Sequence, residues 1–417
     1  MMMTFKFGSI RNNLHYKGAL LYAFFIPLHP KMATLAIIIW LFLSMISYKS
    51  GNVVKNKFLW LLPLFYVSYA VGFLNSGISD YGFIESKLSL LAFPVLFFIH
   101  DYSLQQRMDM LRALVAGLTL AGFVCLLVAT YRSTSIENGI FVFQANVLSG
   151  KGFVESIMYG GNYFFGRHFS IFHQTVYFAL YLCIGIAVLM FRPNEFKPLL
   201  RIVLIMFFLA LLFLISNKAS FIALVMVLQM LLFFSTYSVR QKVRGLAISI
   251  AVTLLFVFGN PRAREAIRKV VVDGITINKN ERYGFGTRLL SWDAAFNLIQ
   301  QKPILGYGHE NTQKQLNTYY LKNNYTFALK ESYNAHNLWL QSWLENGIVA
   351  VLLLLCVFSV LFSKSVGSPL FLSFVLILLV NSIFEGMFNR FSGISFVSFI
   401  CCYIMTNPKK GGVVDEA

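Results

Sequence analysis

Charged residues are scarce in this sequence. They make up 12% of its 417 residues, against about 25% in a soluble globular domain, while 57% of the residues are apolar. This composition excludes a soluble enzyme and a disordered chain. Cysteine is scarce as well: the five cysteines are an odd number and all lie inside apolar runs. A secreted disulfide scaffold is therefore excluded too.

Several signature motifs are missing. The sequence has no GxxxxGK[ST] phosphate loop, no HExxH, no CxxC and no DxD pair at an outer position. ATP hydrolysis therefore has no support, and neither a bound metal nor a cofactor is indicated. The isolated glycines around Tyr307 and His309 do not amount to a cofactor motif.

Long apolar runs are abundant instead. Because a membrane crossing takes ~20 apolar residues, the sequence predicts an all-α polytopic bundle of about twelve spans. The predicted spans cover about 18–30, 32–48, 58–75, 83–99, 110–131, 169–191, 199–216, 219–237, 245–260, 336–362, 368–385 and 391–406.

The net charge of +18 reflects membrane topology and does not indicate a nucleic-acid partner, because Lys and Arg fall mainly in short gaps between apolar runs. With the N-terminus in the cytosol, the inside segments hold 17 basic and five acidic residues. The short outside loops hold only four basic residues. Both termini are therefore predicted to be cytosolic. The basic N-terminal segment lacks a small-residue cleavage site and is interpreted as a tail, not a signal peptide.

Two outside segments are too long to be simple connectors. The larger one is predicted to contain a helix with Thr287 as N-cap, which ends at Lys302-Pro303. The apolar stripe of this helix comprises Leu289, Trp292, Phe296 and Ile299. The predicted organisation is an N-terminal bundle at 1–260 with a minor outside loop at 132–168, the large outside loop at 261–335, C-terminal spans at 336–406 and a cytosolic tail at 407–417.

Ionisable residues in or at the ends of spans are costly and are therefore functional candidates. In the predicted topology they all lie toward the outer ends of their helices, which indicates one shared site. They are Lys87, His173, Lys218, His336, Glu345, Glu385 and Arg390.

Most of these residues also have a structural interpretation. Lys87 and Lys218 are long side chains that can snorkel to the outer interface. Glu385 and Arg390 can form an ion pair at a turn, and His173 can be a hydrogen-bonded core residue.

His336 and Arg288 are stronger candidates. His336 opens the tenth predicted span directly after the large loop, where a titratable base can act on a substrate at the membrane interface. The loop has 11 basic and six acidic residues, an excess that an anionic ligand would explain. Arg288 follows the predicted helix start, where a guanidinium and free backbone N–H groups can meet a phosphate. A solvated surface arginine is the alternative.

Three stretches make the sequence resemble the O-antigen ligase and polymerase superfamily of bacterial envelope enzymes. The first runs from Gly286-Thr287-Arg288 through Pro303-Ile304-Leu305-Gly306-Tyr307-Gly308. The second is Ala335-His336-Asn337-Leu338-Trp339-Leu340, continuing to Glu345-Asn346-Gly347. The third is the outer turn Ser216-Asn217-Lys218-Ala219-Ser220, where many members of the family have arginine in place of Lys218.

The resemblance implies a metal-independent glycosyltransferase of the bacterial inner membrane with its active site on the periplasmic side. The donor would be a glycan on undecaprenyl diphosphate, and the acceptor lipid A-core or another lipid-linked glycan. Arg288 would hold the diphosphate with help from Lys218, and His336 would accept or orient the proton of the acceptor hydroxyl. Lys87, His173, Glu385, Arg390 and Asn337 are supporting candidates.

The ligase interpretation leads, and a polymerase that extends O-antigen or exopolysaccharide is the alternative within the family. A transporter or flippase of lipid-linked sugars is the alternative from another class. It predicts polar residues through the whole membrane depth, whereas the middle of the predicted spans is almost purely Leu, Ile, Val and Phe. The implied partners are the donor, the acceptor and membrane lipids.

Overall fold

The computed structural model describes residues 13–48, 54, 56–75, 81–234, 238–273, 278–281 and 284–407. These residues are predominantly helical, and their single sheet is a hairpin of β1 (Thr134–Glu137) and β2 (Ile140–Phe143). The predicted all-α class is confirmed. Except for Asn407, the predicted cytosolic tail lies outside the described residues.

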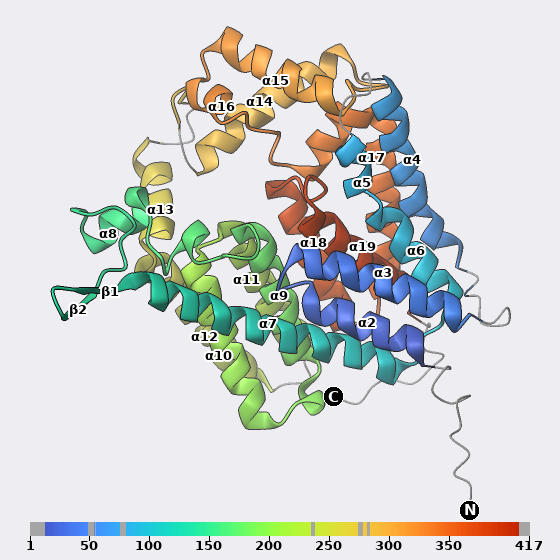
Figure 1. Cartoon of the computed structure of the whole chain (residues 1–417), viewed down its shortest axis with the longest axis horizontal. Helices are drawn as coiled ribbons and strands as arrows, with labels where there is room; N and C mark the ends of the chain where they lie inside the picture. The colour runs from blue at the N-terminus through green and yellow to red at the C-terminus, as the bar shows by residue number, and fades with distance from the viewer. Residues whose placement is uncertain are drawn as a thin grey trace, which may run out of the picture.

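The helices follow one another with mostly short connections (Figure 1). Short 3₁₀ or π turns lie at Lys57–Trp60, Ser156–Gly160, Gly166–His168 and Pro193–Glu195. The α-helices are α2 (Leu14–Phe25), α3 (Pro30–Ile46), α4 (Leu61–Asn75), α5 (Tyr81–Ser86), α6 (Ser89–Ile99), α7 (Leu104–Ser133), α8 (Phe153–Glu155), α9 (Thr175–Phe191), α10 (Pro198–Ile215), α11 (Lys218–Phe234), α12 (Val239–Gly259), α13 (Pro261–Asp273), α14 (Phe285–Gln301), α15 (His309–Asn323), α16 (Thr326–Lys330), α17 (Leu338–Ser365), α18 (Pro369–Phe384) and α19 (Phe391–Met405).

Each of the twelve predicted spans overlaps a helix, as expected for a polytopic membrane protein. The first predicted span falls on α2, which has only 12 residues. Six apolar helices of the described part of the chain are shorter than 18 residues. By length and composition, five helical segments of that part are long and apolar enough to cross a membrane: Gly82–Ile99, Leu104–Ser133, Pro198–Ile215, Val239–Gly259 and Leu338–Ser365.

The helices α2 and α3 form an antiparallel pair (Figure 1), as expected from the tight turn His29-Pro30-Lys31 between the first two predicted spans. Pro30 occupies the first turn of α3, and the His29 side chain caps that helix by accepting a hydrogen bond from the N–H of Lys31, 3.1 Å away. The two helices approach closely where Gly18 faces Trp40, since a Cβ at Gly18 would lie 2.6 Å from the Trp40 Cα. The residues of the turn and the close packing of α2 on α3 therefore both favour an antiparallel arrangement of these helices.

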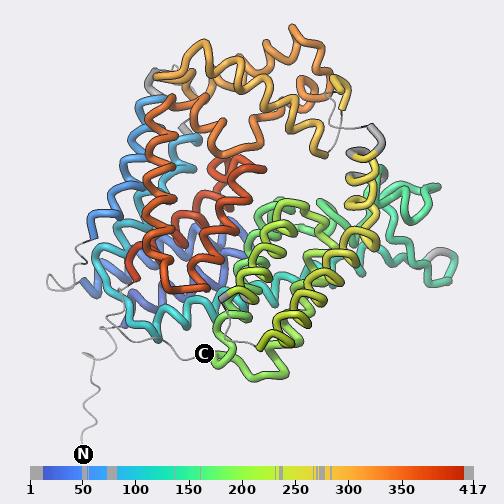
Figure 2. Tube along the Cα trace, turned by 180° about the vertical axis from the view of Figure 1, so that it is seen from behind, coloured from blue at the N-terminus to red at the C-terminus, as the bar shows by residue number. Residues whose placement is uncertain are grey.

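Two large hydrophobic cores hold the molecule together. The first lies among the apolar helices and includes nearly all of α9 and α19. The second lies in the segment after α13, where α14, α15 and α16 pack on one another and on the start of α17. These helices lie together at one end of the molecule in both views (Figures 1 and 2). The large predicted loop is thus a folded helical layer.

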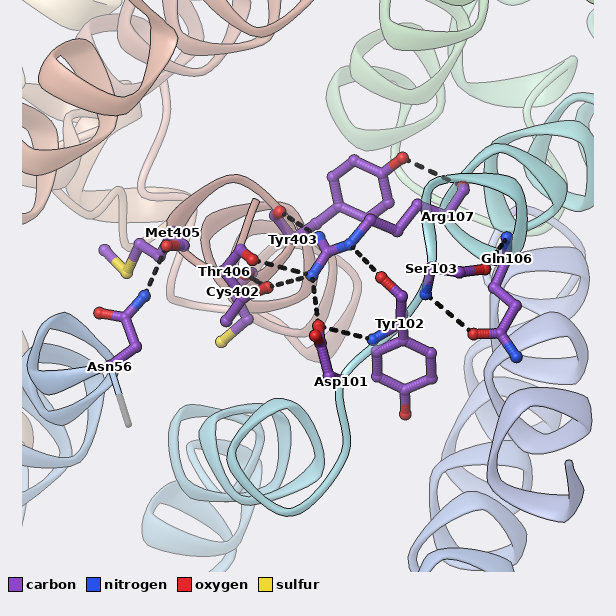
Figure 3. Close-up of polar contacts among 10 residues, drawn as sticks. All are labelled: Asn56, Asp101, Tyr102, Ser103, Gln106, Arg107, Cys402, Tyr403, Met405 and Thr406. Atoms are coloured by element: carbon purple, nitrogen blue, oxygen red, sulfur yellow. Dashed lines mark hydrogen bonds and ion pairs between the residues drawn. The ribbon is translucent and has the colours of Figure 1, made fainter. Parts of the chain in front are cut away.

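A buried arginine holds the C-terminal end of α19 (Figure 3). Arg107, only 2% exposed, donates hydrogen bonds from Nη1 to the carbonyl oxygen of Tyr403 and from Nη2 to that of Thr406, at 2.9 and 3.0 Å. Its Nε donates to the carbonyl oxygen of Tyr102, 3.0 Å away. The last carbonyls of a helix have no partner within the helix. Arg107 supplies those partners and thereby ties α7 to α19.

Candidate functional site

Arg288 lies in the first turn of α14, which begins after Gly284. Its Nε donates a hydrogen bond to the carbonyl oxygen of Phe384, 3.0 Å away, and its Nη1 donates a longer one, at 3.5 Å, to that of Gly284. Nη2 makes no hydrogen bond to the described residues. The guanidinium is therefore anchored at Nε and, over a longer distance, at Nη1, which leaves Nη2 available for a ligand.

The helix that carries Arg288 differs from its prediction. Thr287, the predicted N-cap, lies inside the first turn, and its Oγ1 donates to the carbonyl oxygen of Gly284. Gly284 has a φ of +93°, so a glycine turn replaces the predicted threonine cap. The predicted apolar stripe is also displaced, because Phe296 is 52% exposed and small residues let the helix pack against α15 and α17. The buried face comprises Thr287, Leu290, Ser291, Ala294, Ala295, Leu298 and Ile299.

Lys218 is the exposed first residue of α11. The chain reverses just before it, at Ser216 with a φ of +58°, and the Asn217 side chain accepts a backbone N–H from the first turn of α11. A Cβ placed on Gly284 would lie 3.8 Å from the Lys218 Nζ. Because Arg288 contacts the carbonyl group of the same glycine, the two cations converge there.

His336 faces Glu385, its Nδ1 lying 3.6 Å from the carboxylate Oε1. This separation exceeds a hydrogen bond, and Nδ1 has no hydrogen-bond partner among the described residues. His336 has a φ of +45°, unusual for a residue other than glycine, and its N–H donates to the side chain of Asn334. Because Glu385 directly follows Phe384, one short turn contacts both Arg288 and His336. We call Lys218, Arg288, His336 and Glu385 the Arg288 cluster.

The charges in this cluster influence one another. Burial by itself would raise the pKa of the Glu385 carboxyl, but the His336 imidazole and the Arg288 guanidinium outweigh burial and lower this pKa below its usual range. Burial lowers the pKa of Arg288, and the Glu385 carboxylate opposes that effect. Glu385 is therefore ionised at neutral pH, and two cations and one anion line the cluster when His336 is neutral.

Three other predicted site residues have different surroundings. Asn337 is the N-cap of α17, and its side chain accepts two backbone N–H groups of the first turn. His173 is buried, and its Nδ1 lies 2.9 Å from the Ser392 hydroxyl, as in a hydrogen-bonded core histidine. Arg390 is exposed, and no ion pair within 4.0 Å joins it to Glu385. These residues do not enter the Arg288 cluster.

Lys87 is another predicted site residue, and its side chain does not extend to the membrane interface. Its side chain is 1% exposed, and its Nζ donates a hydrogen bond to the carbonyl oxygen of Phe388. Phe388 belongs to the same turn between α18 and α19 as Glu385. Lys87 thus contacts the turn that carries part of the Arg288 cluster, from the buried side.

Two segments that carry the family resemblance, 303–308 and 345–347, contact each other directly. The N–H of Tyr307 donates to the carbonyl oxygen of Leu344 at 2.7 Å, and the N–H of Gly308 donates to the carbonyl oxygen of Glu345 at 3.0 Å. These bonds attach the segment after α14 to α17. The relative position of Arg288 and His336 therefore depends on this contact.

Glycine makes the close contact feasible. Gly347 interrupts α17 with a φ of +71°, and a Cβ there would lie 1.8 Å from the carbonyl oxygen of Ile304. Gly306, in the segment between α14 and α15, has a φ of +67°. A Cβ at this position would lie 2.6 Å from the carbonyl oxygen of Leu344. Both positions require a residue without a side chain.

Sequence reasoning missed two residues of this region. The Trp292 ring stacks on Phe384 at a centroid distance of 6.3 Å, and its buried Nε1 has no hydrogen-bond partner among the described residues. Its spacing of four residues from Arg288 places both on one helix face. The His309 Nδ1 lies 2.9 Å from the buried Glu345 carboxylate. The signal for His309 was the presence of Glu345 inside an apolar span, where a carboxylate needs a partner.

Comparison with known proteins concerns one part of the chain. No curated protein matches the chain. Residues 202–355 match the model of a protein family described as O-antigen ligase. The matched stretch contains Lys218, Arg288 and His336, whereas Glu385 and Lys87 lie outside it. The resemblance to the O-antigen ligase and polymerase superfamily is therefore confirmed, and it rests on residues 202–355 of this membrane protein, which are similar to the O-antigen ligase family.

Proposed function

We propose that the chain is a glycosyltransferase that moves a glycan from undecaprenyl diphosphate to a lipid A-core acceptor on the periplasmic face of the bacterial inner membrane. The observation that carries the proposal is the convergence of Lys218 and Arg288 at Gly284, with His336 and Glu385 beside them. Two cations and a titratable base in one cluster are what transfer from a lipid diphosphate needs.

In this reaction Arg288 and Lys218 bind the diphosphate. As the bond between the anomeric carbon and the phosphate oxygen breaks, its electron pair passes to the diphosphate, whose negative charge grows. Fixed cations that are already in position stabilise that charge without reorganisation. Arg288 presents Nη2 of a planar guanidinium that the backbone holds in place, and Lys218 presents a mobile point charge, so Arg288 sets the orientation of the diphosphate.

His336 serves as the base. Its Nδ1 faces the ionised Glu385, which favours a proton on Nδ1 and leaves Nε2 as the acceptor of the proton from the attacking hydroxyl group. The hydroxyl oxygen then bonds to the anomeric carbon, and the proton stays on the imidazole, whose positive charge Glu385 stabilises. Glu385 is thus a positioning residue for His336.

The acceptor distinguishes this proposal from its alternatives. Purified protein in nanodiscs is given a glycan on undecaprenyl diphosphate together with lipid A-core, and the products are separated by mass. A ligase attaches the glycan to lipid A-core, whereas a polymerase lengthens the lipid-linked donor. Transport of the donor across a vesicle membrane without any transfer would refute the enzyme proposal and support a flippase.

A second measurement tests the role of the cations. If Arg288 and Lys218 supply the positive charge, excess EDTA leaves the transfer rate within about twofold of its initial value. Strong inhibition by EDTA that added Mg²⁺ reverses would contradict the metal-independent mechanism.

A further inference from the structure

Lys87 is a buried cation that contacts the turn carrying Glu385. It lies in the turn between α5 and α6, is 1% exposed, and packs its Nζ over the rings of Phe83 and Tyr69 at 4.5 and 5.1 Å. A charge that is removed from water is costly unless it is paired and hydrogen-bonded. The partners of Lys87 therefore indicate what the residue does.

The charge of Lys87 is balanced by Glu345 of α17, which is also 1% exposed and interacts with it electrostatically. The Glu345 Oε1 accepts hydrogen bonds from His309 Nδ1 at 2.9 Å and from Gln341 Nε2 at 2.7 Å. The His309 ring in turn stacks on Phe83 with centroids 3.6 Å apart. Lys87 is thus held by a network that joins α15 and α17 to α5.

The hydrogen bond of Lys87 points to one backbone position. Its Nζ donates to the carbonyl oxygen of Phe388, in the short turn between α18 and α19. That turn begins at Glu385, and the N–H of Met387 donates to the Glu385 carbonyl oxygen at 3.0 Å. Lys87 itself is too buried to touch a substrate. Its effect on the site passes through the turn.

We propose that Lys87 is a positioning residue of the transfer reaction: by holding the Phe388 carbonyl group, it keeps Glu385 facing His336. The proposal rests on the proposed function, in which His336 is the base. It assigns to the buried network of Lys87, Glu345 and His309 the task of joining the helical layer to the turn that carries Glu385.

A double-mutant cycle tests the proposal in the full-length protein. Lys87→Met removes the hydrogen bond, and Glu385→Gln removes the carboxylate on which it would act. We expect Lys87→Met to lower kcat about 10-fold and to change KM for the lipid-linked donor less than twofold, because the loss is one of orientation. In the Glu385→Gln protein, Lys87→Met has no further effect on kcat. Losses that multiply across the two backgrounds would overturn the proposal.

A second readout does not depend on glycan transfer. Diethylpyrocarbonate modifies neutral imidazole, so the pH dependence of His336 modification, followed by mass spectrometry, reports its protonation. Loss of the facing carboxylate changes the electrostatic surroundings of the imidazole, and the pH profile of its modification shifts. Lys87→Met and Glu385→Gln should share this shift. The other groups around the pair, Lys218 of α11, Arg288 of α14, Tyr177 of α9 and the ring of Tyr333, are unchanged in both variants.

Control variants separate positioning from folding. Lys57→Met removes an exposed lysine that also lies over an aromatic ring, at 5.8 Å from the Phe58 centroid, and should behave as wild type. If Lys87→Met does not fold, Lys87→Met/Glu345→Gln removes both buried charges and avoids a lone carboxylate. This double variant should still shift His336 modification.

The two proposals fail in different ways. A wild-type protein that transfers no glycan refutes the proposed function. An unchanged midpoint of His336 modification in the folded Lys87 variants refutes the positioning role, whether or not the wild type transfers glycan.

Discussion

Arg288 of α14 donates a 3.0 Å hydrogen bond from its Nε to the carbonyl oxygen of Phe384, the last residue of α18. This bond joins the helical layer to the turn that carries Glu385. Arg288 therefore has two tasks in the proposed reaction, since it binds the diphosphate through Nη2 and holds this turn through Nε.

Replacement of Arg288 by lysine separates charge from geometry. Arg288→Lys keeps one positive charge but loses both the Nε hydrogen bond and the planar fork. We expect kcat to fall about 100-fold, the cost of one well-placed donor to a developing negative charge. Arg288→Ala should abolish transfer. Arg268→Lys, at a 63% exposed position in α13, is the matched control. Full activity of Arg288→Lys would contradict both tasks of the residue.

Glu385 makes stability depend on pH. Its pKa lies below the usual value of about 4.3 because His336 and Arg288 outweigh burial. A carboxyl whose pKa is lowered in the folded state contributes stability above its unfolded-state pKa, and that contribution is lost as the pH falls through the folded-state pKa. Between about pH 5 and pH 3, the apparent unfolding temperature of the wild type should therefore fall more than that of Glu385→Gln.

The comparison needs a carboxyl control in an exposed position. Glu331→Gln removes an exposed carboxylate after α16 and should leave the pH dependence of the wild type unchanged. Thermal unfolding in detergent, followed by intrinsic fluorescence, measures all three proteins. Parallel curves for the wild type and Glu385→Gln would contradict the electrostatic role of Glu385.

Two glycines with similar φ values distinguish strain from close contact. Gly347 and Gly367 have φ values of +71° and +81°, but a Cβ at Gly347 would meet the Ile304 carbonyl oxygen at 1.8 Å, whereas nothing lies within 4 Å of one at Gly367. Gly367→Ala should cost about 1–3 kcal/mol from strain alone. Gly347→Ala should cost clearly more and also reduce transfer, because the contact positions His336. Expression yield and unfolding temperature measure the difference, and equal losses would contradict the interpretation.

Arg107 is one of the 17 basic residues of the predicted cytosolic segments. We expect it to stabilise the fold as well. Arg107→Leu leaves backbone carbonyls at the end of α19 and before α7 without a donor, at about 1–3 kcal/mol each. We expect the apparent unfolding temperature to fall by about 5 °C or more. Lys197→Leu removes another basic residue from a predicted cytosolic segment, but its side chain is exposed. If Arg107→Leu unfolded at the wild-type temperature, the hydrogen bonds of Arg107 would not stabilise the fold, and its charge would matter only for membrane topology.

Helix positions could be predicted from the sequence, but helix ends could not. The apolar runs place every predicted span on a helix, since burial of apolar side chains dominates both signals. The ends depend on local capping. α17 begins after the Asn337 cap and not at His336, and α14 begins after Gly284 and not after Thr287. In each case the backbone conformation of a single residue sets the start of the helix, and the periodicity of apolar residues does not predict that conformation.

The same limit applies to the site. Arg288 and His336 could be identified because each lies in a recognisable stretch of sequence. Glu385 could be suspected only from its cost inside a membrane protein. It was expected in one shared site with His336, but the ion-pair partner considered for it was Arg390 and not His336. The contact of Lys87 with Phe388 spans 301 residues and ends on a backbone carbonyl group, which has no residue type to identify it. Tertiary packing alone creates such a contact.

The interruption of α17 at Gly347 has a mechanical consequence. The carbonyl groups of Leu344 and Glu345 accept hydrogen bonds from the N–H groups that follow α14, and these bonds join the first part of α17 and the helical layer into one body. That body contains Arg288 and, just before α17, His336. Lys218 and Glu385 belong to the bundle. Any opening that admits a bulky glycan by hinge motion at this helix must therefore separate the cluster into two halves and reassemble it around the substrate.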